Sequence, residues 1–172
     1  MKDLKFIKIN KEDISGLQAD ARAIWLERYT DIISQEQIEY MLNWMYSKDI
    51  IEREIEHENI NYYFIFHDGI KLGFCSMGPY PDVAGRAKLH KLYLYPKFHG
   101  KGFGSTSLLK VCSLAQKQGY DSICLNVNKN NLSAIKAYER NGFTKEKSVV
   151  NDIGNAYVMD DYVMLKELSS LI

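Results

Sequence analysis

The sequence predicts an α/β protein of the α+β type, with helices on both faces of a mixed, mostly antiparallel sheet of about six or seven strands. Alternating apolar residues over 89–95 predict a central strand, and a helix follows it directly after a glycine-rich turn. A second buried strand over 122–127 comes after that helix. A strand–helix–strand unit of this length is right-handed, with its strands parallel or nearly so. Short alternating segments over 62–77 and 147–166 indicate antiparallel neighbours.

The first third of the chain is predicted to be mainly helical. A short strand over 4–9 precedes a helix over 10–29, which begins with a potential N-cap and acidic residues in the first turn. A second helix over 34–45 starts with Ser34-Gln35-Glu36-Gln37, a capping-box sequence. A short, strongly charged helix over 47–58 completes this region.

The rest of the chain is predicted to complete the sheet. Strands over 62–66 and 70–77 form a hairpin whose turn, His67-Asp68-Gly69, places glycine where a positive φ is needed. A short helix over 132–141 ends at Gly142. Three short strands are expected to form a closing meander, over 147–150, 155–159 and 161–166.

Charge is unevenly distributed along the chain. Acidic residues outnumber basic ones between Lys11 and Asn61, whereas no Asp or Glu occurs between Asp82 and Asp121. The acidic helices are either an ordinary solvated surface or the rim of a cleft that attracts a cationic substrate. The whole chain has 22 basic and 22 acidic residues, and this balance argues against a dedicated nucleic-acid-binding protein.

Composition further limits the class of protein. At 172 residues the chain is expected to form one domain over 1–172. Its three cysteines stand in apolar runs without C-x-x-C spacing, which is typical of reduced thiols in a cytoplasmic protein. The four histidines lack the spacing of a helical metal site, so no metal is expected. Neither a signal peptide nor a membrane span is visible, so no membrane partner is expected.

Three glycines at alternate positions separate the central strand from its helix. They are Gly100, Gly102 and Gly104, and without a Cβ they let backbone N–H groups converge on one point. The helix N-terminus adds its positive end, so the loop is predicted to bind an anion, most simply a phosphate or pyrophosphate.

Two common nucleotide-binding motifs do not fit this loop. A Walker loop needs a Ser or Thr after its lysine, but Lys101 is followed by Gly102. A dinucleotide fingerprint needs a third glycine, and that place falls on Ser105 or Ser107. A nucleotide-binding protein of either kind is therefore disfavoured.

Two motifs resemble the GNAT superfamily of N-acetyltransferases. The family's acetyl-CoA loop reads [Q/R]-x-x-G-x-[G/A], and here 99–104 reads His-Gly-Lys-Gly-Phe-Gly, with His99 where Gln or Arg is usual. The segment 131–143 matches the family pattern N-x-x-A-x-x-x-Y-x-x-x-G-F at every fixed position. The resemblance implies a GNAT fold with a splayed parallel strand pair, acyltransferase activity, and acetyl-CoA as co-substrate.

The resemblance also implies where the cofactor lies. The pantetheine arm would follow the central strand, the loop N–H groups would take the pyrophosphate, and a lysine side chain could reach the 3′-phosphate. Asn131 would hold the pantetheine amide or serve only as a helix N-cap. The implied cofactor-binding residues are Leu92, Tyr93, Leu94, His99, Gly100, Lys101, Gly102, Phe103, Gly104, Ser105, Asn131, Ser133, Lys136 and Tyr138.

Two residues are candidates for catalysis. By the resemblance Tyr138 lies near the cofactor sulfur, where its hydroxyl could protonate the departing thiolate; the alternative is a core tyrosine. The attacking amine must lose a proton, and His90 stands where family members often place a Glu. His90 is otherwise an ordinary strand residue, and Glu27, Asp31 and Asp161 are weaker candidates for the base.

The layout is similar to bacterial spermidine/spermine N-acetyltransferases, in the charged N-terminal helices, the Leu-His-Lys-Leu-Tyr-Leu strand and the ending around 157–161. The predicted substrate is thus a primary amine, possible acceptors being a polyamine such as spermidine, an amino acid, an antibiotic or a protein N-terminus. Aromatic side chains could hold an ammonium by cation–π contact. The substrate-binding candidates are Trp25, Tyr29, Asp31 and Trp44. A non-enzymatic acetyl-CoA sensor is the alternative from another class, and the sequence leaves homodimerisation open.

Overall fold

The computed structural model describes residues 3–168. Contacts divide this part of the chain into two compact units. The first covers the described residues up to Gly78 together with Lys91–Ser107, and the second covers Pro79–His90 together with the described residues from Leu108 onward. Hydrogen bonds link seven strands in the order β1-β2-β3-β4-β5-β7-β6. Strand β4 (Arg86–Leu94) and helix α4 (Phe103–Lys117) each contribute residues to both units.

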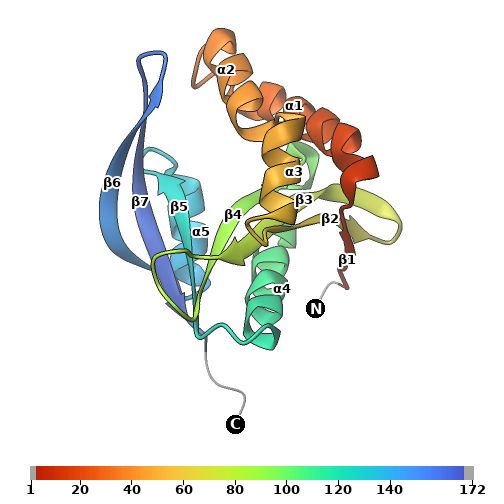
Figure 1. The fold of residues 1–172 in the computed structure, drawn as a ribbon, viewed down its shortest axis with the longest axis vertical. Helices are drawn as coiled ribbons and strands as arrows, with labels where there is room; N and C mark the ends of the chain where they lie inside the picture. The colour runs from red at the N-terminus through yellow and green to blue at the C-terminus, as the bar shows by residue number, and fades with distance from the viewer. Residues whose placement is uncertain (1–2, 169–172) are drawn as a thin grey trace. The chain divides into compact units, whose positions relative to one another are not determined.

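The first unit contains three helices and a three-stranded antiparallel arrangement. Strand β1 pairs with β2, and β2 pairs with β3. Helices α1, α2 and α3 pack against one another (Figure 1). Its elements are β1 (Lys5–Lys8), the 3-10 turn η1 (Lys11–Asp13), α1 (Ile14–Tyr29), α2 (Gln35–Tyr46), α3 (Lys48–Glu56), β2 (Asn61–His67) and β3 (Ile70–Pro79).

The predicted hairpin of the first unit is confirmed. Its turn consists of Asp68 and Gly69, with φ of 49° and 76°. Two consecutive residues with positive φ form a turn whose twist matches the flanking strands. The turn sequence therefore sets the register of β2 against β3.

Helix α2 begins as the sequence predicted. The Ser34 hydroxyl accepts a hydrogen bond from the Gln37 N–H at 3.1 Å. We expect Ser34→Ala to lower the free energy of unfolding by about 1 kcal/mol, because one N–H of the first turn loses its acceptor. Ser47 is the matched control, since it precedes α3 without a capping bond from its side chain. Urea unfolding of both variants checks this, and equal losses would contradict it.

Buried charges hold helices α1 and α3 onto the strands of the first unit. Asp20 of α1, 6% exposed, accepts a hydrogen bond from the Tyr95 hydroxyl at 2.6 Å and lies 2.6 Å from Lys71 Nζ. Lys91 of β4, 8% exposed, lies 3.5 Å from a carboxylate oxygen of Glu54 on α3. Asp20 and Lys91 thus each have an opposite charge close by, which offsets the cost of burying them.

The second unit contains a parallel strand pair and a long hairpin. Residues 86–89 of β4 pair in parallel with 122–125 of β5, which confirms the predicted parallel pair. Strand β7 pairs antiparallel with both β5 and β6. The elements after α4 are β5 (Ser122–Asn128), α5 (Leu132–Arg140), β6 (Thr144–Gly154) and β7 (Tyr157–Glu167).

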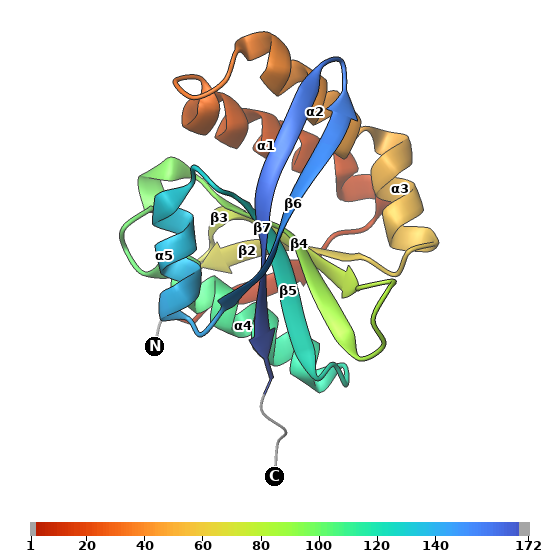
Figure 2. The same cartoon turned by 90° about the vertical axis from the view of Figure 1, so that its left-hand side faces the viewer.

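The predicted closing meander of three strands is wrong. Residues 155–159 and 161–166 do not form two strands, because Tyr157–Glu167 is a single strand, β7. The turn before it is Asn155 and Ala156, with φ of 52° and 61°. Strands β6 and β7 form a twisted ribbon that extends past the end of β5 (Figure 2).

The error has a physical cause. Asp160 interrupts the apolar pattern and separates the two expected strands 155–159 and 161–166. Tertiary pairing keeps the chain extended there, because the Asp160 carbonyl accepts a hydrogen bond from the Lys129 N–H at 3.0 Å and Asp161 pairs with Asn128 of β5. Such partners on neighbouring parts of the chain outweigh the low strand propensity of aspartate.

The predicted helix ends at Gly119 and Gly142 are confirmed, with φ of 88° and 86°. No helix within residues 3–168 has the length and apolar character needed to cross a membrane.

Candidate active site

The glycine loop of the first unit ends at the N-terminus of α4. After β4 the chain makes a 3-10 turn over Pro96–Phe98, and α4 starts at Phe103. The Gly102 carbonyl accepts hydrogen bonds from the Thr106 N–H and hydroxyl, both at 3.1 Å, so Gly102 is the N-cap of α4. The first N–H groups of a helix have no acceptor within the helix and carry its positive end.

The space in front of this loop is open. Gly100 and Gly102 have φ of 71° and 82°, which favours glycine at both positions. A Cβ placed on Gly100, Gly102 or Gly104 would meet no atom within 4 Å. The backbone is therefore exposed to an approaching ligand, and the loop fits the predicted role as an anion cradle.

Two side chains fix the loop in place. The His99 ring donates from Nε2 to the Leu94 carbonyl at 3.0 Å, because a carbonyl can only accept. The His99 N–H donates to the Pro96 carbonyl at 2.9 Å. Phe103 is buried, with its ring centroid 6.1 Å from that of Phe98. His99 thus shapes the loop through ring and backbone, and its direct contact with a cofactor stays a prediction.

The strand residues predicted to line the pantetheine arm are tightly packed. Leu94 is buried, whereas Leu92 and Tyr93 are half-buried. A Cβ on Gly73 of β3 would lie 2.0 Å from the Tyr93 carbonyl oxygen, so only glycine allows this close approach. The Tyr95 N–H donates to the Leu72 carbonyl at 2.9 Å, which fixes the end of β4 against β3.

The four substrate-binding candidates divide into two groups. The Trp25 ring centroid lies 4.9 Å from that of Tyr29 and 5.7 Å from that of Tyr93. Trp25 is only 4% exposed. Burial raises the pKa of the Tyr29 phenol. Trp44 is 43% exposed and Asp31 is also exposed, so the structure places these two outside the aromatic cluster.

Sequence reasoning missed the buried Lys91 beside this cluster. Its ammonium lies 5.3 Å from the ring centroid of Tyr46 and 2.8 Å from the hydroxyl oxygen of Tyr62. That hydroxyl donates to Glu54, and burial raises the pKa of the Tyr62 phenol far above its usual range. The signal was present in the strand alternation, which grouped Lys91 with the apolar residue Leu89.

In the second unit, Asn131 caps helix α5. Its side-chain oxygen accepts from the Ala134 N–H at 3.3 Å and from the Ser133 hydroxyl at 3.2 Å. The Asn131 side-chain nitrogen has no partner within the part of the chain that the structure describes. The N-cap role is therefore present, and the amide nitrogen remains able to donate to a ligand.

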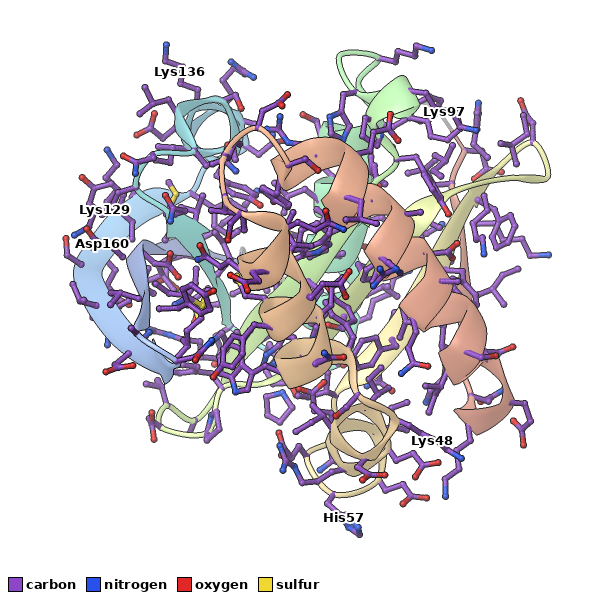
Figure 3. The ribbon with its side chains drawn as sticks, turned by 90° about the horizontal axis from the view of Figure 1, so that it is seen from above. Lys48, His57, Lys97, Lys129, Lys136 and Asp160 are labelled. Carbon is purple, nitrogen blue, oxygen red and sulfur yellow. The ribbon has the colours of Figure 1, made fainter. Side chains whose placement is uncertain are left out.

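Tyr138 lies on the same helix and is half-buried. Its ring centroid is 5.9 Å from that of Phe143, and its carbonyl accepts from the N–H groups of Asn141 and Phe143 at 3.0 and 3.1 Å. Ser133 is exposed, and Lys136 projects away from the helix (Figure 3). The ring of Tyr138 is thus held by packing while its catalytic role stays a prediction.

His90 occupies β4 at the point where the described parallel pairing ends. Ala87 and Leu89 are buried, whereas Arg86, Lys88 and His90 alternate with them and are half-buried. The Nε2 atom of His90 is itself buried. Its role as a base stays a prediction.

Comparison with known proteins agrees with this geometry. The model of the acetyltransferase (GNAT) family matches residues 19–143. The spermidine N(1)-acetyltransferase of Thermoplasma acidophilum is 32% identical over 149 residues, covering 84% of this chain and 91% of that protein. The spermine/spermidine N(1)-acetyltransferase of Bacillus subtilis is 27% identical over 137 residues, covering 76% and 86%.

A solved structure shows the same fold. It is a crystal structure of an N-acetyltransferase from Thermoplasma acidophilum in complex with coenzyme A, with a TM-score of 0.75 and 29% identity. The likeness covers 96% of this chain and 99% of that one, which confirms the predicted GNAT fold. With the family match over residues 19–143, these findings also confirm the predicted acyltransferase class. The chain belongs to the acetyltransferase (GNAT) family.

Proposed function

We propose that this N-acetyltransferase moves the acetyl group of acetyl-CoA to a primary amine, and that the amine is a polyamine such as spermidine. Coenzyme A in the Thermoplasma acidophilum structure supports acetyl-CoA as the co-substrate. The polyamine is supported by two relatives that are named as spermidine or spermine acetyltransferases.

The observation that carries the proposal is the open glycine loop at the start of α4. Its two positive-φ glycines have open space beside them, and the first turn of the helix that follows has N–H groups without acceptors in the helix and the positive end of its dipole. A diphosphate fits such a site because its oxygens accept from several N–H groups at once. The surrounding sequence contains no acidic residue between Asp82 and Asp121 that would repel it.

We also assign Asn131 and strand β4 to cofactor binding. Asn131 would donate its side-chain nitrogen to a pantetheine carbonyl while its oxygen continues to cap α5. Strand β4 would offer backbone groups to the extended arm of the cofactor, as sheet edges do to peptides.

The reaction needs one proton removed and one supplied. A primary amine has a pKa of about 10, so a base must remove its proton before its nitrogen attacks the thioester carbonyl. We assign this role to His90, because a neutral imidazole can accept a proton. The new C–N bond forms, the C–S bond breaks, and the Tyr138 hydroxyl donates its proton to the departing sulfur.

A thiol-release assay tests the proposal. Purified protein with acetyl-CoA is presented with spermidine, lysine, an aminoglycoside and a peptide with a free N-terminus. We expect the largest kcat/KM with spermidine, and calorimetry should detect coenzyme A binding. If another amine is acetylated and spermidine is not, the proposed substrate class is refuted. If the protein binds coenzyme A but acetylates no amine, a sensor is favoured.

A further inference from the structure

Asp161 of β7 differs from the other buried charges of this protein. Within residues 3–168, the charged residues classed as buried are Asp20, Lys91 and Asp161. Asp20 has Lys71 at 2.6 Å, and Lys91 has Glu54 at 3.5 Å. Asp161 is only 2% exposed, yet no lysine, arginine or histidine of the described chain lies within 4 Å of its carboxylate. Burying such an uncompensated charge is costly.

The surroundings of the Asp161 carboxyl are polar, but among the described residues they provide no cation within ion-pairing distance. Burial raises its pKa, and a hydrogen bond from the Asn126 side chain opposes that effect. The neighbouring Asp160 raises the pKa further, whereas Lys88 and Lys129 lower it from beyond ion-pairing distance. Lys129 is already paired with Asp160 at 2.5 Å, and the two lie side by side in Figure 3.

Strand register shows which face of the sheet carries this carboxyl. Asp161 is opposite Asn128 of β5, and residues opposite each other in a ladder point to the same face. Side chains two residues apart along a strand share a face, so Asn126 lies on this face too. Asp160 points to the opposite face, together with Lys129.

The parallel pairing brings β4 to the same face. Lys88 is opposite Cys124, so these two side chains point to the same face. Cys124 is two residues before Asn126, and His90 is two residues after Lys88. Lys88 and His90 are therefore on the face that carries Asp161. The described pairing of β4 with β5 ends at 89 and 125, and the next residues are His90 and Asn126. Polar groups from three strands, namely His90, Asn126 and Asp161, therefore face the same way where this pairing ends.

We propose that Asp161, supported by Asn126, is the anionic group that binds a protonated nitrogen of the acceptor, so that the enzyme selects amines with a second positive charge. This inference rests on the proposed function and specifies its substrate class. A diamine or polyamine brings the cation that Asp161 lacks, while a different nitrogen of the same molecule is acetylated. An acceptor with one nitrogen cannot make both contacts.

The sign of the stability effect separates this role from a structural one. A carboxyl whose pKa is raised by folding destabilises the folded state as the pH rises through that pKa. Asp161→Asn removes this cost, so we expect its urea midpoint at neutral pH to equal or exceed that of the wild type. Asp20→Asn is the contrast, because it leaves Lys71 without its buried partner and should lower the midpoint.

The kinetic test compares amines that differ by one charge. Wild type, Asp161→Asn and Asp160→Asn are assayed with cadaverine, spermidine and pentylamine, which has a single nitrogen. We expect Asp161→Asn to lower kcat/KM for cadaverine and spermidine by about 10- to 100-fold, mainly through KM, because a buried charge contact is lost. For pentylamine, Asp161→Asn should change kcat/KM by less than about threefold. Asp160→Asn should change kcat/KM for all three amines by less than about twofold, since an exposed ion pair contributes little.

A binding measurement provides a readout that does not depend on turnover. Calorimetry with spermidine and the coenzyme A-saturated protein should show affinity rising as the pH passes the pKa of Asp161, and this rise should disappear in Asp161→Asn. The charged groups that act on this titration are Lys88, Lys129 and Asp160, and His90 of β4 lies on the same face of the sheet.

The outcomes are distinguishable. If the wild type acetylates no amine, the proposed function fails and this inference fails with it. If the wild type acetylates spermidine while Asp161→Asn keeps its preference for cadaverine over pentylamine, only the inference is overturned. An Asp161→Asn protein that unfolds, or is destabilised as Asp20→Asn is, would also overturn it, because Asp161 would then have a structural partner such as Lys88.

Discussion

Replacing Tyr138 with phenylalanine is expected to lower kcat by about 100- to 10,000-fold, the range for losing a general acid. The substitution removes only the hydroxyl, so the packing of the ring against Phe143 is retained. Affinity for coenzyme A should therefore change by less than about threefold, since a single neutral hydrogen bond contributes little net free energy. Steady-state thiol release at saturating spermidine gives kcat, and calorimetry with coenzyme A gives the dissociation constant.

Tyr120→Phe is the matched control, because Tyr120 is also half-buried in the second unit and has no proposed role in the reaction. Its kcat should equal that of the wild type. If Tyr138→Phe also turns over at the wild-type rate, Tyr138 is a core residue and another group must protonate the sulfur.

Gly102→Val is expected to weaken coenzyme A binding by about 100-fold or more. The new Cβ would enter the open space in front of the loop, where we place the diphosphate. Losing two hydrogen bonds to a charged group, at about 1.5 kcal/mol or more each, corresponds to that factor. Calorimetry with coenzyme A measures the effect, and acetyl transfer should fall with it.

Backbone strain must be separated from the loss of the binding site. Gly69 provides the control, because its φ of 76° is close to the 82° of Gly102 and a Cβ there also meets nothing within 4 Å. Gly69→Val and Gly102→Val should both lose about 1–3 kcal/mol of stability from the strained backbone. Only Gly102→Val should lose coenzyme A binding. Equal affinities in the two variants would rule out the glycine loop as the diphosphate site.

Local signals explain what could be predicted. The turn Asp68-Gly69, the N-cap Ser34 and the helix ends at Gly119 and Gly142 each depend on a few neighbouring residues, and all are confirmed. The family and the acyltransferase class followed from two motifs with fixed spacing, and the family match confirms both. Acetyl-CoA as co-substrate, a polyamine acceptor and a single domain over 1–172 stay predictions.

Non-local partners explain what could not be predicted. Asp160 looks like a break between two strands until its hydrogen bond from Lys129 and the pairing of Asp161 with Asn128 are known. The spacing of Trp25 along its helix does not show that the rings of Tyr29 and Tyr93 lie beside it, and its contact with an ammonium stays a prediction. Such burial depends on residues far apart in the chain, which no local pattern contains.

The sequence by itself determined the glycine loop, the helix that follows it and the family, because glycine conformation and motif spacing act over short stretches of chain. Only the tertiary structure decided which charges are compensated. Lys91 meets Glu54 from another element, whereas Asp161 is buried with no lysine, arginine or histidine of residues 3–168 within ion-pairing distance. A charge becomes functional or structural through its burial and its partners, and both are set when distant strands and helices come together.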